Sequence, residues 1–401
     1  MRRFIVPLAL IAGSALVGLL IAELALRAVG YSVPVWFQPD PQLGWTLRPG
    51  AAGWFTREGR AYVKVNSSGR RDRDVLLHKP KDVYRIAVLG DSYSEAMQVA
   101  REQAYWALLP ERLAACGFQP GKRIEVLNFG VSGHGTAQQY VMLETRAMRY
   151  RPDLVLLQFT NGNDVKDNSF ALSGENNRPF FMLEPDGTLR IDDSFASSPD
   201  FRKHTSLTFQ VARRLSDRSR VLQLVREVRS RPLMSQAQAG APQASGVEQG
   251  LEPMVLAPPP DRLWDEAWRI TEALIARTAD YAARNGARFM IFTVPYAIQV
   301  HPDANARASL QARLGVEDLF YPDRRIAELA KRNGLLAVPL APTMQRLAEE
   351  SGAFFHGFSN VGMGRGHWNE LGHRTAADLI ARQLCSLRGS QEPEGVRRSA
   401  Q

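Results

Sequence analysis

One serine, in the tripeptide Gly90-Asp91-Ser92, occupies a position that suits a nucleophile. It follows Tyr84–Gly90, an apolar run that predicts a buried strand ending on a glycine. A serine between the carboxyl end of a strand and the start of a helix is exposed. The backbone N–H groups of such a helix point toward any oxyanion that forms beside the serine. On its own, the tripeptide is more typical of an ordinary helix cap.

Three further polar segments occupy comparable places in the chain. Two of them follow predicted strands and the third opens the last predicted helix. They are Asn128-Phe129-Gly130-Val131-Ser132-Gly133, Asn161-Gly162-Asn163-Asp164 and His367-Trp368-Asn369-Glu370. Ligands of open α/β sheets bind at the carboxyl ends of the strands. We therefore expect the two segments that follow strands to reach the same sheet edge as Ser92.

The elements that carry these segments alternate between strands and helices. Strands are predicted at 84–90, 124–128, 154–159, 288–294 and 335–338, and helices at 103–116, 136–149, 262–284, 322–332 and 370–387. The strands are apolar on both faces, which indicates a parallel sheet covered by helices on both sides. The sequence therefore predicts one α/β domain with a large insertion at about 170–260.

Outside these elements the pattern is less regular. Residues 31–80, rich in Gly, Pro and Trp, are expected to form an irregular lead-in. Within the insertion we expect a hairpin from Phe180 to Ile191, an Arg-rich amphipathic helix over 206–229 and a disordered polar stretch over 230–260. The Arg-rich helix is interpreted as a solvated face or as a surface lying on an anionic membrane. For the rest of the chain we predict a membrane anchor at 1–30, the α/β domain at 81–390 and a tail at 391–401.

The order and placement of the four motifs resemble the SGNH (GDSL-like) hydrolase superfamily, in particular its membrane-anchored bacterial members. The resemblance runs from about Tyr84 to Leu387 and implies a flavodoxin-like three-layer α/β/α fold with a parallel sheet. It implies Ser92 as the nucleophile and His367 as its base, with no metal and no cofactor. It also implies an oxyanion hole formed by the Ser92 and Gly133 backbone N–H groups and the Asn163 side chain. Asp91 and Asp164 are expected to support the loops.

Two positions depart from the family pattern. Asn161 stands where the third motif usually has glycine. The carboxylate that normally precedes the histidine is missing, because its usual positions hold Gly364 and Arg365. In a serine protease, loss of the orienting carboxylate lowers kcat by about 10⁴-fold. A distant carboxylate or a main-chain carbonyl orients His367, or the site is a Ser–His dyad; the sequence leaves these alternatives open.

The amino terminus carries a targeting signal. Met1-Arg2-Arg3 precedes an uncharged, mostly apolar run from Phe4 to Ala22, close to the roughly 20 residues that a helix needs to cross a bilayer. We expect an uncleaved single-pass anchor in the inner membrane, and the positive flank predicts that the domain lies on the periplasmic, extracytoplasmic side. The alternative is a cleaved signal peptide, although no clear cleavage site follows Ala22.

The net charge of the chain limits the classes of partner that we expect it to bind. The formal net charge is +9, but the arginines are dispersed and not interleaved with aromatic residues, so we expect no nucleic-acid partner. An anionic membrane or an acidic glycan is compatible with the charge.

The two cysteines, Cys116 and Cys385, lie on helices that share a sheet face in flavodoxin-like folds. A disulfide between them is a hypothesis that an exported location would permit.

These features predict an ester hydrolase that acts on O-acyl (acetyl) groups of an envelope glycan or another acylated substrate through an acyl-Ser92 intermediate. The substrate class follows from location and family analogy alone. An O-acyltransferase with the same Ser–His site and a non-catalytic glycan-binding protein are the alternatives. The acyl group, the acceptor and the oligomeric state are left open.

Overall fold

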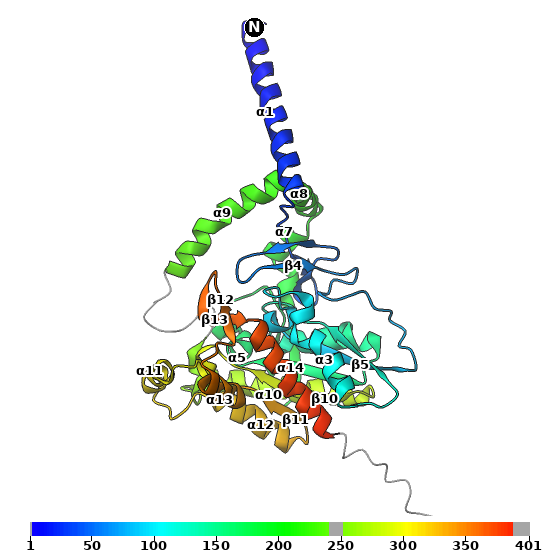
Figure 1. Cartoon of the computed structure of the whole chain (residues 1–401), viewed down its shortest axis with the longest axis vertical. Coiled ribbons are helices and arrows are strands. Elements are labelled where there is room, and N and C mark those ends of the chain that lie inside the picture. The colour runs from blue at the N-terminus through cyan, green and yellow to red at the C-terminus, as the bar shows by residue number, and fades with distance from the viewer. Residues whose placement is uncertain (1, 240–251, 388–401) are drawn as a thin grey trace, which may run out of the picture.

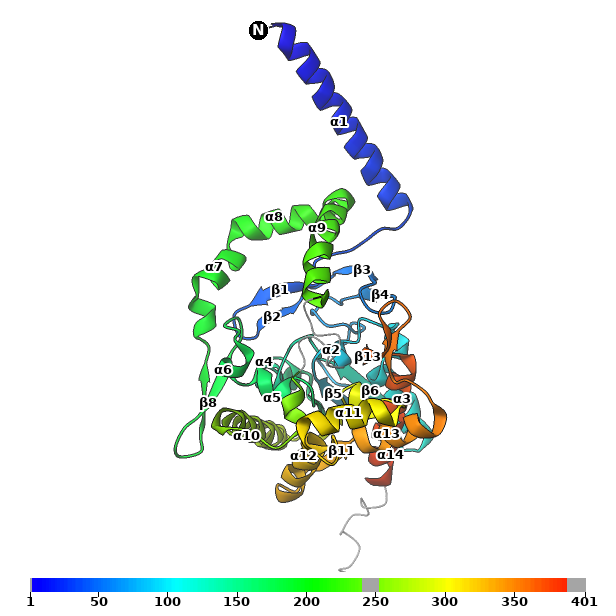
Figure 2. The same ribbon diagram turned by 90° about the vertical axis from the view of Figure 1, so that its left-hand side faces the viewer.

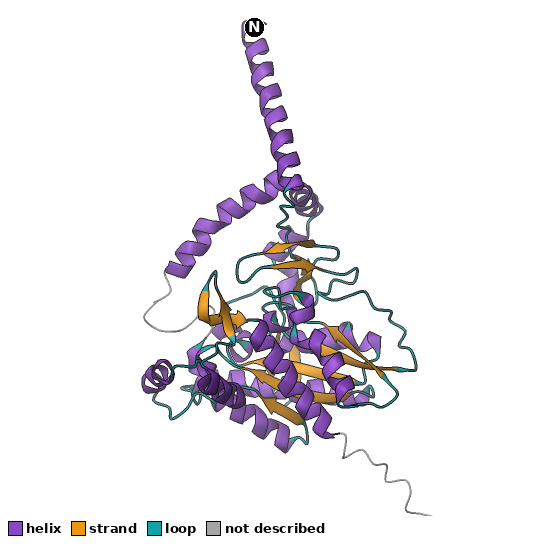
Figure 3. Cartoon of the chain, viewed as in Figure 1, coloured by secondary structure: helices purple, strands orange, loops and turns teal. Residues whose placement is uncertain are grey.

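A five-stranded parallel sheet forms the centre of the computed structural model, which describes residues 2–239 and 252–387 (Figure 1). The strand order is β11-β10-β7-β5-β6. The strands are β5 (Val83–Leu89), β6 (Arg123–Asn128), β7 (Leu154–Thr160), β10 (Arg288–Val294) and β11 (Leu336–Pro339). Figure 3 shows this sheet between layers of helices. The predicted three-layer α/β/α fold with a parallel sheet is confirmed.

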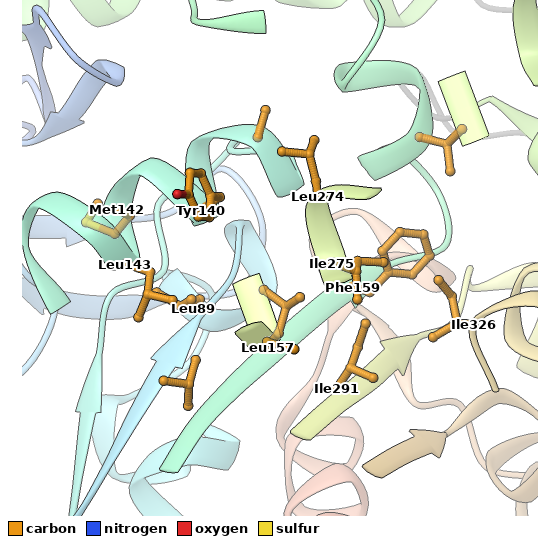
Figure 4. Packing of buried hydrophobic residues seen from close by; sticks show 14 of the residues in the cluster. Leu89, Tyr140, Met142, Leu143, Leu157, Phe159, Leu274, Ile275, Ile291 and Ile326 are labelled. Atoms are coloured by element: carbon orange, nitrogen blue, oxygen red, sulfur yellow. The ribbon is translucent and has the colours of Figure 1, made fainter. Parts of the chain in front are cut away.

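Each face of the sheet is buried under helices. One face is covered by α3 (Tyr105–Ala115), α13 (Ala341–Ser351) and α14 (Glu370–Ser386), the other by α4 (Thr136–Thr145), α10 (Arg262–Arg284) and α12 (Tyr321–Arg332). Figure 4 shows the second face, where Leu157 and Ile291 of the sheet pack against Leu143, Leu274 and Ile326. Since β7 is buried at every position, its near-continuous apolar sequence follows from its place inside the sheet.

Smaller elements surround this core. Four antiparallel hairpins pair β1 with β2, β3 with β4, β8 with β9, and β12 with β13. Their bounds are β1 (Phe37–Asp40), β2 (Gly44–Leu47), β3 (Ala52–Phe55), β4 (Ala61–Lys64), β8 (Phe180–Leu183), β9 (Leu189–Asp192), β12 (His356–Phe358) and β13 (Gly362–Trp368). The short helices are α2 (Ser92–Glu95), α5 (Asp164–Asp167), α6 (Phe170–Ser173), α7 (Pro199–Thr205) and α11 (Ala304–Leu314).

The lead-in at 31–80 differs from the irregular stretch that its sequence predicts. It contains the β1–β2 and β3–β4 hairpins, and Leu47, Val63 and Val65 form a small core of their own. Each strand spans only four residues, too few for the alternation of apolar and polar residues to stand out among Gly, Pro and Trp. The predicted hairpin at 180–191 is present as β8–β9.

The insertion also departs from expectation. The single helix predicted at 206–229 is two helices, α8 (Leu207–Arg218) and α9 (Arg220–Ala239), because Ser219 adopts an extended backbone. The disorder predicted at 230–260 is wrong at both ends of that stretch. Helix α9 continues to Ala239, and Val255 and Leu256 are buried against the core. Residues 240–251, like the tail at 391–401, lie outside the described residues.

Helix α1 (Arg2–Ala28) extends away from the domain (Figures 1 and 2). The stretch Val6–Ala28 has a mean hydropathy of 2.2 and is long and apolar enough to cross a membrane. A signal sequence shares these properties. Among the described residues there is therefore one candidate membrane helix, near the amino terminus.

The two cysteines form a disulfide. Cys116 follows α3 and Cys385 lies in the last turn of α14, and their Cα atoms are 6.1 Å apart. Both helices cover the same face of the sheet, as the disulfide hypothesis requires. The bond closes a loop with a sequence separation of 269 residues, and such long-range cross-links most strongly restrict the unfolded chain.

Candidate active site

Ser92 lies at the carboxyl edge of the sheet, where β5 gives way to α2. Gly90 makes the turn possible, because a Cβ there would overlap the side chains of Gln158 and Ser94. The Asp91 carboxylate then caps α2 by accepting a hydrogen bond from the Tyr93 amide at 2.9 Å. Ser92 is half-buried among buried neighbours. The local sequence thus presents one hydroxyl at a rigid strand-to-helix turn.

His367 approaches Ser92 from the other end of the chain. It stands near the end of β13, just before Asn369, whose side chain caps α14. The His367 Nε2 atom lies 2.8 Å from Ser92 Oγ. The structure therefore joins the two residues that the sequence places 275 positions apart.

Glu58 is the third member of this chain of contacts, and its part was not predicted. Its Oε2 atom lies 2.5 Å from His367 Nδ1, and its Oε1 atom accepts a hydrogen bond from the His367 amide at 2.5 Å. These contacts assign the proton to Nδ1 and leave Nε2 to accept from the Ser92 hydroxyl. Of the alternatives for orienting His367, the structure contains the distant carboxylate.

The loop between β3 and β4 holds Glu58 in place. Asn360, beyond β12, accepts from the Gly59 amide at 3.0 Å and donates to the carbonyl oxygens of Thr56 and Gly59. Burial opposes ionisation of the Glu58 carboxyl, but the charge and hydrogen bonds of His367 outweigh it, so the pKa of Glu58 lies below its ordinary value. Glu58 is therefore an anion beside the imidazole at neutral pH.

The role of Glu58 could not be predicted from the sequence, because Glu58 lies 309 residues before His367 in a stretch without a recognisable motif. The usual carboxylate positions contribute none here: Arg365 is exposed, and Gly364 adopts a positive φ of 77°. The one available signal was the absence of the expected aspartate. That absence indicated that a partner should be sought elsewhere, without saying where.

Gly133 and Asn163 come to the same edge from β6 and β7. Gly133 has a positive φ of 77°, and a Cβ there would stand 3.1 Å from the Trp45 ring. Within the described parts of the chain, no hydrogen bond has the amide of Ser92 or Gly133 as its donor. Asn163 Nδ2 lies 3.5 Å from Asp91 Oδ2 and 3.4 Å from Asp167 Oδ2. Two backbone N–H groups thus remain available for an incoming oxygen, and the Asn163 amide lies next to Asp91.

Asp91 and Asp164 bind neighbouring backbone and side chains. Asp91 Oδ1 also accepts from Gln158 Nε2 at 2.6 Å, and Asp164 Oδ2 accepts from the Thr160 amide at 2.9 Å. Burial, followed by the nearby Asp91 charge, raises the pKa of Asp164 well above its ordinary value. These contacts tie together the loops that follow β5 and β7.

Asn161, which replaces the usual glycine, has contacts of its own. Its Nδ2 atom donates to Asp323 Oδ2 at 2.7 Å and to Gln299 Oε1 at 3.2 Å. Burial raises the pKa of Asp323 to about 6. The Asn161 side-chain amide therefore links the end of β7 to α12. The usual glycine has no side chain that could make this link.

A buried carboxyl adjoins the Gly133 loop. Glu95, in α2, contacts the Ser132 hydroxyl. Burial raises the pKa of Glu95 to about 7, against the opposing effects of the Ser132 hydrogen bonds and Arg71. The sequence did not single out this residue. The loop that carries one proposed oxyanion donor is thus linked to a group that titrates near neutrality.

A cavity of about 870 Å³ opens beside Gly133, within the size range of ligand-binding pockets. Its walls come from the lead-in and the insertion, and they combine aromatic rings with amide, carboxylate and guanidinium groups. The residues nearest the Gly133 loop are Trp45 and Arg178, which bond to the Ser132 and Gly133 carbonyl oxygens at 2.9 Å each. Among the described residues, no group of three or more His, Cys, Asp or Glu side chains is placed to hold a metal ion.

Comparisons with known proteins place this geometry in a family. Residues 88–322 match the model of the GDSL-like lipase/acylhydrolase family. No curated protein matches the chain. Among solved structures, LAE5, a hydrolase from the metagenome of Lake Arreo, Spain, is 16% identical, with a TM-score of 0.37 and coverage of 75% of this chain and 94% of the other.

Two acetyl xylan esterases are also similar. AlAXEase is 13% identical, with a TM-score of 0.37 and coverage of 74% of this chain and 97% of the other. Axe2 from Geobacillus stearothermophilus is 13% identical, with a TM-score of 0.36 and coverage of 76% and 96%. The family-model match spans more than half of the chain. This chain belongs to the GDSL-like lipase/acylhydrolase family and is an ester-acting hydrolase.

Proposed function

We propose that this protein is a membrane-anchored, extracytoplasmic serine esterase that removes O-acyl groups, acetyl above all, from an envelope glycan. The observation that carries the proposal is the continuous chain from Ser92 Oγ through His367 to the Glu58 carboxylate. A histidine held in this way can take the serine proton and return it.

The reaction proceeds in two halves. Ser92 Oγ attacks the ester carbonyl carbon while its proton moves to His367 Nε2, and the carbonyl oxygen becomes an oxyanion. The Ser92 and Gly133 N–H groups stabilise this oxyanion, with the Asn163 amide as the third donor. The bond to the alkoxy oxygen then breaks, and His367 gives that oxygen its proton. Water repeats the sequence on acyl-Ser92 and releases the carboxylic acid.

Glu58 acts through His367. Its carboxylate fixes the Nδ1–H tautomer and stabilises the imidazolium that forms each time Nε2 takes a proton. The alternative of a non-catalytic binding protein depended on the missing carboxylate before His367. The Glu58 contact at 2.5 Å removes that reason for it.

Two features support the location and the substrate class. Helix α1 is apolar along Val6–Ala28, with none of it buried in the domain, as expected for a membrane anchor. The cavity that meets the site at Gly133, and is lined by neither Ser92 nor His367, combines aromatic rings, including Phe201 and Phe209, with polar groups. Sugar rings present both apolar faces and hydroxyl edges, so this lining suits a glycan that carries the ester.

The test compares the full-length protein in detergent with Ser92→Ala and His367→Ala, using p-nitrophenyl acetate. We expect each substitution to lower kcat by about 10³-fold or more. Glu111→Gln, on the exposed side of α3, is the control and should keep full activity. Equal rates for wild type and both variants would refute the Ser–His mechanism. Faster release of p-nitrophenol on adding a glycan, with acetyl recovered on that glycan, would instead favour the acyltransferase.

A further inference from the structure

Helix α8 has two opposite faces. Phe209, Ala212, Arg213 and Ser216 line the cavity beside Gly133. On the other side, exposed residues recur at helical spacing and fall within a stripe of about 100°, given 3.6 residues per turn. These residues are Leu207, Val211, Arg214, Leu215 and Arg218. One helix therefore separates the cavity from an outer surface of leucine, valine and arginine.

The outer stripe is apolar and positively charged. Leu207 is 77% exposed and Leu215, two turns later, is 57% exposed, an unusual arrangement for a helix that faces only water. Within the described chain, neither Arg214 nor Arg218 has a carboxylate within ion-pair distance. The stripe thus combines aliphatic side chains with guanidinium groups that have no carboxylate partner among the described residues.

The junction of α8 and α9 is attached to the last turns of α1. Arg27 Nη2 donates to the Arg218 carbonyl oxygen at 2.7 Å. Glu23 accepts from the Ser219 hydroxyl and the Arg220 amide at 3.0 Å each, and from the Val221 amide at 3.1 Å. Glu23 therefore satisfies N–H groups that the first turn of α9 would otherwise leave free.

This attachment fixes the level of α8 relative to a bilayer. About 20 apolar residues cross the hydrocarbon core, so a crossing that begins near Phe4 ends close to Glu23. Glu23 and Arg27 then lie at the headgroup level, and so does the start of α9. In Figure 2, α8 runs across the direction of α1 on the side of the domain from which α1 extends.

We infer that the outer stripe of α8 binds the surface of the anionic bilayer that α1 crosses, with its aliphatic side chains among the acyl chains and Arg214 and Arg218 on lipid phosphates. Helices of this composition lie in the plane of the membrane interface. The domain would then be held at two points, with the cavity directly under the membrane. The inference depends on the proposed anchoring by α1 and is independent of the proposed ester hydrolysis.

The test measures depth in the bilayer by spin labels on single introduced cysteines in the full-length protein. The variants are Leu207→Cys and Leu215→Cys, with Leu16→Cys to report insertion of α1. Leu76→Cys is the matched control, because Leu76 is 78% exposed and precedes β5, away from the edge that carries Ser92. The vesicles contain phosphatidylcholine with or without phosphatidylglycerol. For each spin label, the frequency of collision with oxygen, which is enriched in the bilayer, is compared with that of collision with a water-soluble nickel chelate.

In anionic vesicles, labels at 207 and 215 should favour oxygen over nickel, while the label at 76 should show the reverse. Adding Arg214→Glu and Arg218→Glu should move the label at 207 back toward the aqueous value without changing p-nitrophenyl acetate turnover. A buried label at 16 together with aqueous labels at 207 and 215 would overturn the inference and leave the anchor intact. An aqueous label at 16 would overturn both.

Discussion

The two sides of the candidate site are built differently. Ser92 stands on the buried β5–α2 turn, where Gly90 admits no side chain and Asp91 and Gln158 are tightly bonded. Glu58 stands in a loop of the β3–β4 hairpin, outside the sheet, and depends on contacts with Asn360. The nucleophile is therefore positioned by the core of the domain, and the base is oriented by a peripheral element. Changes to the hairpin should affect chemistry and leave folding largely intact, and changes to the core should do the opposite.

The largest effect is expected for Glu58→Gln. Glutamine keeps the shape of the side chain but cannot fix the Nδ1–H tautomer or balance the imidazolium, so kcat should fall by roughly 10³- to 10⁴-fold. The melting temperature should change little, since the hairpin is not part of the main core. The measurement is p-nitrophenyl acetate turnover beside thermal unfolding of the same samples. A Glu58→Gln enzyme with near-wild-type kcat would show that a Ser–His dyad suffices.

Loss of the disulfide should have the reverse pattern. Replacing Cys116 and Cys385 with serine should lower the free energy of unfolding by about 3 kcal/mol or more, because the cross-link restricts a very long loop of the unfolded chain. Turnover per folded molecule should be unchanged below the melting temperature. Calorimetry with and without a reductant checks this: the reductant should lower the melting temperature of wild type alone. Unchanged stability of the double variant would contradict the prediction.

Glu95 gives the core side a pH dependence. Its pKa is raised to about 7 from 4.5, so the folded state binds the proton more tightly than the unfolded state. Its contribution to stability is greatest below pH 4.5 and is lost as the pH rises to about 7, by roughly 3 kcal/mol in total. Glu95→Gln should flatten this part of the curve of melting temperature against pH, with Glu111→Gln as control. Parallel curves for wild type and Glu95→Gln would refute it.

The smallest effect is expected for Asn360→Ala. The alanine removes the contacts to Thr56 and Gly59 and so makes the Glu58 carboxylate more mobile without removing it; kcat should therefore fall by about tenfold, the equivalent of about 1.4 kcal/mol. Because the loss comes from mobility of Glu58, adding Glu58→Gln to this variant should cost less than it costs wild type. Strictly additive losses would show that Asn360 does not act through Glu58.

The core half of the site could be predicted because local patterns determine it. A strand such as 84–90 is apolar on both faces, and its carboxyl end has to meet the ends of its neighbours. Ser92, Gly133 and Asn163 therefore fall at one edge without any knowledge of distant contacts, and their roles remain predictions until the variants are measured.

The peripheral half could not be predicted. Strands of four residues leave too weak a pattern in 31–80, and the pairing of Glu58 with His367 depends on how two hairpins dock. The break at Ser219 has a similar cause, because Glu23 in α1 provides the contacts that start α9. Val255 and Leu256 were assigned to disorder because the stretch 230–260 as a whole is rich in Gln, Ala, Pro and Gly.

The positions of Cys116 and Cys385 also determine when, during synthesis of the chain, the disulfide can form. Its first sulfur follows α3 and its second belongs to α14, so the bond can close only after every described strand of the sheet has been synthesised. Until then α3 and α14 are held together by non-covalent contacts alone. A chain that is truncated before α14, or one that matures where thiols stay reduced, never acquires this cross-link.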